Sequence, residues 1–372
     1  MKNEVSVAKT PSEKSARLLS LDAFRGADML CILGLDALAR ALTGAFPQNA
    51  FCVALRQQFA HVPWEGLALY DCVFPAFVFI SGVSMAFSFA KKREREESRA
   101  RVACSLLKRA AILVALGAIL QGALSFDFAG TRFASVLGLI GVANAIGGLL
   151  ALFLETPKKI LAALLCISVA VAGAHFLGGN FTSAETFNVK LDALLLPGKF
   201  HNGNYDPEGV LCVVSASVAV LAGFLVGSFL ERRKCDSANI RTAGTLAAVG
   251  AGIVALALGA GTFYPVIKSI WTQTFVLAAV GWSLVAFSVF YTLFDVLKLE
   301  KLAFVFKIIG VNAIAIYVLQ WIFPFDRLAK LLFGGVANFC GDAAGVALVL
   351  GAISLKLLLL LWLFRRKIFF KI

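Results

Sequence analysis

The chain has 372 residues, of which 60% are hydrophobic and only 15% are charged, with a mean hydropathy of +0.85. A soluble domain is about 45–50% apolar and about 25% charged, so this composition excludes an ordinary soluble protein. The net charge of +13 sits in short segments between apolar runs, which favours a topological role and argues against nucleic-acid binding. The eight Cys residues show neither CxxC nor Cys/His spacing, so we expect no metal and no disulfide framework.

Apolar runs recur along the whole chain and predict an all-α, polytopic membrane helix bundle with about ten transmembrane helices. Each run is close to the ~20 residues that cross ~30 Å of hydrocarbon. The runs lie at 24–42, 70–90, 106–125, 133–153, 159–178, 208–230, 242–261, 271–294, 303–323 and 342–364. We therefore divide the chain into a cytoplasmic N-terminal segment (1–23), a single transmembrane domain (24–364) and a basic cytoplasmic tail (365–372).

Connecting segments that are rich in Lys and Arg alternate along the chain with segments that hold few of them. With the N-terminus inside, the inner segments hold 26 of the 35 Lys and Arg residues, and eight of these lie in 91–109 alone. Basic residues accumulate on the cytoplasmic side of membrane proteins, so we expect both termini in the cytoplasm. Two outer segments, 43–69 and 179–207, are too long to be turns, and loops of this length are usually functional or disordered.

Ionisable residues at the first predicted span are costly in a membrane and mark a site. Asp22, Arg25 and Asp28 follow each other at intervals of three, near one helical face. Arg25 could bind a phosphate or a carboxylate between the two Asp residues, or the group could be an ion-paired helix start. Asp36, two turns further on, either serves the site or forms a structural hydrogen bond between helices.

The segment FAHVPWEGLALYDCVFPAF begins the second span and carries the next candidates. His61 is one of three His residues in the chain, and His is the natural proton acceptor near neutral pH. Paired with Asp36, Glu65 or Asp71 it would form a base and its orienting carboxylate. The alternative is an interfacial His in an aromatic belt with Trp64.

Three further polar groups follow along the chain. HNGNYDPEGVL offers His201, Asp206 and Glu208 to a sugar-like acceptor, although Asp206 before Pro207 could instead cap the next helix. Lys268 lies at an outer interface. Asn312 and Gln320 are candidates for stabilising an oxyanion, or they bond neighbouring helices.

Four motifs in chain order resemble the transmembrane acyltransferases typified by heparan-α-glucosaminide N-acetyltransferase, whose bacterial members are mostly domains of unknown function. The motifs are RLLSLDAFRG, HVPWEGLALYDCVFPAFVFISGVS, YDPEGVL, and IKSIWTQTFVL with IGVNAIAIYVLQ. The resemblance covers nearly the whole chain.

The resemblance implies a reaction and a catalytic residue. The lysosomal member takes acetyl from cytosolic acetyl-CoA and delivers it to a terminal glucosamine across the membrane. Its catalytic His lies in the His-x-x-Trp-x-Gly motif, which corresponds to His61. The wider transmembrane acyltransferase superfamily shares an Asp-x-x-Arg-Gly opening, which Asp22, Arg25 and Gly26 match. An Asn of that member aligns with Asp36, which would then orient His61. Many relatives have an Arg near the place where this chain has Leu139.

We therefore expect a multi-pass protein of a bacterial inner membrane that transfers an acetyl or acyl group from cytoplasmic acyl-CoA to an extracytoplasmic amino sugar or glycan. In this hypothesis His61 and Asp36 are catalytic, and Arg25, Asp22 and Asp28 bind acyl-CoA. The acceptor is bound by a set of outer residues, Trp64, Glu65, Asp71, His201, Asp206, Glu208 and Lys268. Membrane lipids, acetyl-CoA, the sugar and a second copy in a homodimer are the expected partners. The alternative is a transporter or flippase of a small anion or lipid-linked sugar without catalysis.

Overall fold

The computed structural model describes residues 18–182, 185–201, 203–233 and 238–370. Over these ranges the chain is all-α without a β-strand, and its β pairing is limited to two isolated bridges. Most of the predicted N-terminal segment 1–23, up to residue 17, lies outside the described residues. The helices are α1 (Leu19–Leu30), α2 (Asp36–Ala45), α3 (Ala50–Gln58), α4 (Leu69–Glu94), α5 (Arg99–Leu120), α6 (Val136–Leu154), α7 (Pro157–Leu177), α8 (Phe187–Leu195), α9 (Val210–Arg232), α10 (Ile240–Ala260), α11 (Gln273–Tyr291), α12 (Glu300–Val311), α13 (Ala313–Ile322), α14 (Phe325–Asn338) and α15 (Ala344–Arg365).

Eight helices in the described part of the chain are long and apolar enough to cross a membrane. They correspond to α4, α5, α6, α7, α9, α10, α11 with its extension to Val296, and α15 with the preceding turn. A ninth span results if α12 and α13, which are bent by 57°, count as one. The first of the ten predicted spans, 24–42, is helical but broken, and it is not among these eight. The fold is that of a multi-pass membrane protein.

Polar residues in the connecting segments begin several of these helices. The Ser135 side chain accepts a hydrogen bond from Gly138 N at the start of α6, and Asn239 accepts one from Thr242 N at the start of α10. Each satisfies a backbone donor that the first turn leaves without a helical partner. Asp295 does the same from a distance, because its carboxylate accepts from the backbone N–H groups of Leu19 and Ser20 at the start of α1.

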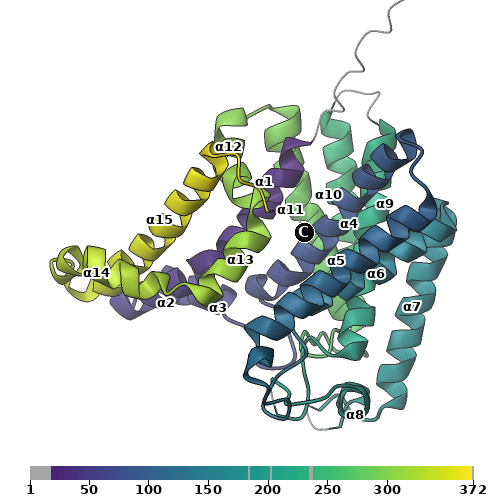
Figure 1. Ribbon diagram of the computed structural model, residues 1–372, viewed down its shortest axis with the longest axis horizontal. Helices are drawn as coiled ribbons and strands as arrows, with labels where there is room; N and C mark the ends of the chain where they lie inside the picture. The colour runs from purple at the N-terminus through teal and green to yellow at the C-terminus, as the bar shows by residue number, and fades with distance from the viewer. Residues whose placement is uncertain (1–17, 183–184, 202, 234–237, 371–372) are drawn as a thin grey trace, which may run out of the picture.

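Three hydrophobic clusters hold the helices of the described chain together, and two of them are large. The larger one joins α4, α6, α9 and α11 through side chains such as Phe79, Val220 and Phe287, all fully buried. The smaller one joins α1, α12, α13 and α15 around Met29 and Ile309. In Figure 1, α14 and α15 lie at the opposite end of the long axis from α7, and α8 lies at the lower edge beside the loops.

Glycines allow a close helix crossing between α4 and α9. A Cβ added at Gly82 would lie 2.1 Å from the carbonyl oxygen of Val220, and one at Gly223 would lie 2.0 Å from that of Phe79. The two backbones approach each other here in the manner of small-residue interfaces in membranes.

The segment between α1 and α2 is a π-helical stretch, Cys31–Leu35, with Gly34 at φ 153°. The Lys356 ammonium of α15 donates to the Leu33 carbonyl at 2.7 Å. The Lys356 side chain of α15 therefore bonds the break between α1 and α2. Helices commonly break where a side chain inserts into the backbone hydrogen-bonding pattern.

Candidate active site

His61 lies in the loop between α3 and α4, and the first turn of α4 holds it in place. One oxygen of Asp71 lies 2.7 Å from His61 Nδ1. The other oxygen accepts from the backbone N–H groups of Ala68 at 3.0 Å and Val62 at 3.3 Å. The Asp71 side chain is fully buried, whereas 54% of the His61 side chain is exposed. A single carboxylate therefore fixes both the loop and the imidazole, and leaves the imidazole accessible.

The loop between α10 and α11 brings Lys268 to the same point. Glu65 and Ile267 form an antiparallel bridge, and Gly66 N donates to Val266 O at 2.9 Å. As a result Lys268 Nζ lies 2.7 Å from His61 Nδ1 and 3.2 Å from Asp71 Oδ1. Burial lowers the pKa of Lys268, and the charge of Asp71 opposes that effect.

Asp71 and Lys268 lie equally close to His61 Nδ1 and favour opposite tautomers, of which the one set by Asp71 suits acid–base work. A neutral His61 that donates its Nδ1 hydrogen to Asp71 keeps a lone pair on Nε2, the form that can accept a proton. Lys268 carries no acceptor, so in this tautomer its ammonium bonds Asp71 Oδ1. Of the three carboxylates that the sequence offered to His61, the structure pairs it with Asp71.

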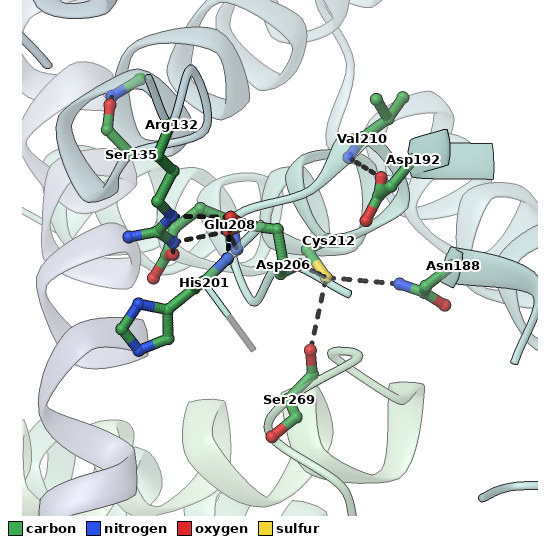
Figure 2. Close-up of polar contacts among 11 residues, drawn as sticks. Arg132, Ser135, Asn188, Asp192, His201, Asp206, Glu208, Val210, Cys212 and Ser269 are labelled. Atoms are coloured by element: carbon green, nitrogen blue, oxygen red, sulfur yellow. Dashed lines mark hydrogen bonds and ion pairs between the residues drawn. The ribbon is translucent and has the colours of Figure 1, made fainter. Parts of the chain in front are cut away.

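A second polar cluster gathers around Arg132, in the loop before α6 (Figure 2). Its guanidinium donates to the two oxygens of Asp206 at 2.6 Å and 2.5 Å, and it also donates to Glu208. The backbone N–H of His201 donates to Asp206 at 3.1 Å. The Arg132 side chain is 11% exposed and Asp206 is fully buried, so this is a buried charge-assisted cluster.

The two carboxyl groups of this cluster differ in proton affinity. Burial acts to raise the pKa of Asp206, but the hydrogen bonds and charge of Arg132 outweigh it, so the pKa lies below its ordinary value. Burial raises the pKa of Glu208 above its ordinary value, against the opposing charge of Arg132. Pairs whose environments push their pKa values apart are suited to acid–base roles.

Asp206 does not cap helix α9, which begins at Val210, after Gly209, rather than at Pro207. The Asp206 side chain accepts from the backbone N–H of Glu208 at 3.0 Å, but this turn precedes the helix. The first backbone N–H of α9, that of Val210, donates instead to Asp192 of α8 at 2.9 Å.

Aromatic contacts join the two clusters. The rings of Trp64 and Tyr205 pack edge to face, with their centroids 5.4 Å apart. The Trp64 indole N–H donates to Phe181 O at 2.6 Å. Tyr205 directly precedes Asp206 in the chain. The two long segments that we predict to lie outside, 43–69 and 179–207, therefore meet here, and the charge of Glu208 also acts on Lys268.

The residues expected to bind acyl-CoA separate in the structure. Arg25 lies 3.5 Å from Asp22 and donates to Ser84 Oγ of α4 at 2.5 Å. Asp28 instead lines a cavity between α1, α4 and α11. Asp36 pairs with Arg40 at 2.8 Å, and that ion pair lies on α2 rather than at His61.

The candidates for an oxyanion site have other contacts. Asn312, 1% exposed, donates to Ile368 O and accepts from Phe370 N, each at 3.1 Å, and so holds the C-terminal tail. Gln320 lines a separate cavity with Asp326 and Lys356. Leu139 is buried in the larger hydrophobic cluster, so α6 places no basic group there. Among the described residues, no group of three or more His, Cys, Asp or Glu side chains is arranged to hold a metal ion.

Arg132 is the residue that the sequence analysis missed. It stands 74 residues before Asp206, and in the sequence it is simply one of the few basic residues on the predicted outer side. The scarcity of outer charges was a usable signal, because a lone Arg beside apolar runs needs a carboxylate partner.

Comparison with known proteins gives a distant relationship. No family model matches the chain. It is 25% identical to human (Homo sapiens) heparan-alpha-glucosaminide N-acetyltransferase, over 84% of this chain and 56% of that protein. It is also 25% identical to the mouse (Mus musculus) protein of the same name, over 72% of this chain and 50% of the other. The chain thus spans about half the length of the curated relatives it matches.

The fold and the comparisons together define a class. The protein is a multi-pass, all-α membrane protein. Within that class, it is a distant relative of heparan-alpha-glucosaminide N-acetyltransferase.

Proposed function

We propose that the protein is a membrane acyltransferase that moves an acetyl or other acyl group from acyl-CoA to an amino sugar or glycan on the outer side. The observation that carries the proposal is the His61–Asp71 pair at 2.7 Å, with a buried carboxylate behind a half-exposed imidazole. The distant relationship to an acetyltransferase supports the same reaction class.

The chemistry follows from the tautomer that Asp71 favours. The acceptor amine or hydroxyl attacks the thioester carbonyl carbon, and His61 Nε2 takes the proton that the acceptor loses. The new C–N or C–O bond forms as the carbonyl π electrons move to oxygen. When they return, the C–S bond breaks, and the CoA thiolate takes up the proton. Alternatively, His61 Nε2 attacks the thioester carbonyl carbon, and the C–S bond breaks to release the CoA thiolate. The acceptor then attacks the acyl-imidazole carbonyl, the C–N bond to His61 breaks, and the acceptor's proton passes to the freed imidazole nitrogen.

Lys268 and Asp71 are positioned to support this step. The imidazolium that forms when His61 accepts a proton is stabilised by the buried carboxylate, which also keeps the ring in its orientation. Lys268, whose pKa burial lowers, is a donor close enough to stabilise charge that develops on the thioester oxygen.

The acceptor fits the cluster on the outer side of His61. Glu208, whose side chain is partly exposed, offers a carboxylate for sugar hydroxyl or ammonium groups, and Trp64 offers a ring surface. The donor's phosphates need cations at the other end of the bundle. Arg25 is one candidate there, and a cavity of about 490 Å³ lined by Lys92, Arg93 and Arg232 is another.

A transfer assay tests the proposal. Purified protein is mixed with labelled acetyl-CoA and a panel of amino sugars from pH 5 to 9. We expect labelled product from the wild type, and a loss of about 10²–10⁴-fold in His61→Gln, the usual contribution of a positioned proton acceptor. Acetyl-CoA binding should persist in that variant. Gln57→Ala, an exposed position on α3, is the control and should transfer at the wild-type rate.

Two results would contradict the proposal. One is the absence of both transfer and CoA binding at every pH. The other is a His61→Gln variant that transfers acetyl as fast as the wild type, whereas a transporter or flippase without catalysis predicts the first result. Acid quenching before the acceptor is added separates the two mechanisms, because label trapped on the protein requires the acyl-His route.

A further inference from the structure

An apolar cavity of about 520 Å³ lies between α1, α4 and α11. Its wall includes Phe24, Val73, Ala76 and Phe290. Asp28 is the one ionisable carboxyl or amino group among the described residues that line it, and no Lys or Arg does so. A CoA nucleotide carries several phosphates and would find no cation here, so the lining suits a hydrocarbon chain.

Asp28 gives this cavity a second, independent feature. The residue is only 6% exposed, and its Oδ2 atom is buried without a hydrogen-bond partner among the described residues. A buried polar atom that lacks a partner costs free energy and calls for an explanation. A ligand with one uncharged hydrogen-bonding group on an apolar chain would supply the partner.

The cavity adjoins the start of α4, next to the candidate active site. Ala68 and Cys72 line it and stand on either side of Asp71 in the chain, within the first turn of α4. Gln58, which also lines it, accepts a hydrogen bond from Leu69 N at 3.2 Å. One end of the cavity therefore lies beside the turn of α4 that carries Asp71.

The cavity also reaches the surface of the bundle that faces lipid. Trp282 of α11 lines it and is 49% exposed, within a helix that is apolar enough to span the membrane. A chain dissolved in the bilayer can enter between α1 and α11 beside this ring without crossing water. The donor, by contrast, is polyanionic and approaches from the basic end of the bundle.

We propose that the acceptor is lipid-linked: its hydrocarbon chain lies in this cavity, a hydroxyl or carbonyl of the chain bonds Asp28, and its sugar head group reaches His61. The inference rests on the proposed acyl transfer, and it specifies the class of acceptor. It also gives Asp28 a role at the acceptor rather than at acyl-CoA.

Photoaffinity labelling tests the proposal without requiring turnover. The probe is a dodecyl glucosaminide with a diazirine in its chain, added to the protein in nanodiscs. We expect crosslinks on the cavity faces of α1, α4 and α11. They should fall at least tenfold in Ala286→Phe, which fills the cavity from α11, and in Ala27→Leu, which fills it from α1. Val289→Phe, on the exposed face of α11 and outside the cavity, should label like the wild type.

Labelling spread over the exposed helix faces, and equal in the filled and control variants, would overturn the proposal. A folded Ala27→Leu protein keeps the test decisive if Ala286→Phe fails to fold. If neither the wild type nor any variant transfers acetyl but the cavity is labelled as expected, the proposed acyl transfer is wrong and the proposed lipid-binding site is supported. If lauroyl-CoA transfer to free glucosamine falls in Ala286→Phe while labelling persists, the cavity serves the donor, and the proposal fails.

The role of Asp28 has its own measurement. A series of dodecyl glucosaminides with a single chain hydroxyl at different positions should include one that labels at least threefold better than the unsubstituted probe. In Asp28→Leu that preference should disappear, while the unsubstituted probe still labels. A preference that survives Asp28→Leu, or no preference at any position, would contradict the assignment of Asp28.

Discussion

At the scale of single residues, two buried carboxylates bond the backbone at the start of a helix. Asp71 holds the backbone of the loop and orients His61. Asp192 of α8 accepts from Val210 N at the start of α9, while its other oxygen is buried without a hydrogen-bond partner among the described residues (Figure 2). The two differ in their surroundings, because Asp71 has Lys268 beside it.

The protonation of Asp192 should make stability depend on pH. Burial raises its pKa to about 6, against the hydrogen bond from Val210. An unfolded Asp titrates near 3.9, so between about pH 4 and 6 the folded state binds more protons than the unfolded state. Stability is then greatest below the unfolded pKa and falls as pH rises through the folded one, by roughly 3 kcal/mol at most.

Melting curves of nanodisc samples from pH 4 to 7 check this expectation. Asp192→Asn keeps an acceptor for Val210 N but cannot ionise, so it should gain stability relative to the wild type as pH rises. The exposed Asp342→Asn variant should show no such gain. Parallel curves for wild type and Asp192→Asn would rule out the assigned titration.

The sequence could predict His61 and a short set of carboxylate partners, because motif and spacing are local. It could not choose Asp71 over Asp36, since that choice depends on where α4 begins and on the ion pair of Asp36 with Arg40. Nor could it find Arg132, whose partners come from a segment 74 residues away.

At the scale of elements, the lengths of the apolar runs in the sequence predicted where the helices lie but not where they break. The predicted span 303–323 is bent at Asn312, where the side chain bonds the backbone of the C-terminal tail. The predicted span 24–42 is broken at Gly34, where Lys356 inserts. Both breaks depend on contacts with distant segments. Within the long outer segments, α3 and α8 are too short to give a transmembrane signal.

The α4–α9 crossing should be intolerant of added side-chain volume. In Gly223→Ala the new Cβ would lie 2.0 Å from the Phe79 carbonyl oxygen, so one helix must move, at a cost of about 1–3 kcal/mol. Gly252→Ala on α10, which has no atom within 4 Å of the new Cβ, should be neutral or stabilising by up to about 1 kcal/mol. Thermal denaturation of both variants in nanodiscs measures the difference, and equal melting temperatures would contradict the close approach.

At the scale of the whole molecule, charge and chemistry separate along the bundle. Lys92, Arg93 and Arg232 line a cavity at one end of the helices, where α4, α5 and α9 have the termini that the basic segments join. His61, Lys268 and the Arg132 cluster lie on loops that connect the opposite helix ends. The distribution of basic residues predicts that the first end faces the cytoplasm. A transferase built this way would receive its donor on one side and its acceptor on the other.

The most direct measurement of this account is a two-sided transfer assay. Proteoliposomes enclose labelled acetyl-CoA, and glucosamine or dodecyl glucosaminide is added outside. The bilayer then keeps the donor and the sugar head group of the acceptor on opposite sides. We predict labelled N-acetylated product outside the wild-type vesicles, and almost none with His61→Gln. Transfer only when both substrates share one side, or transfer that is equal in the wild type and His61→Gln, would contradict it.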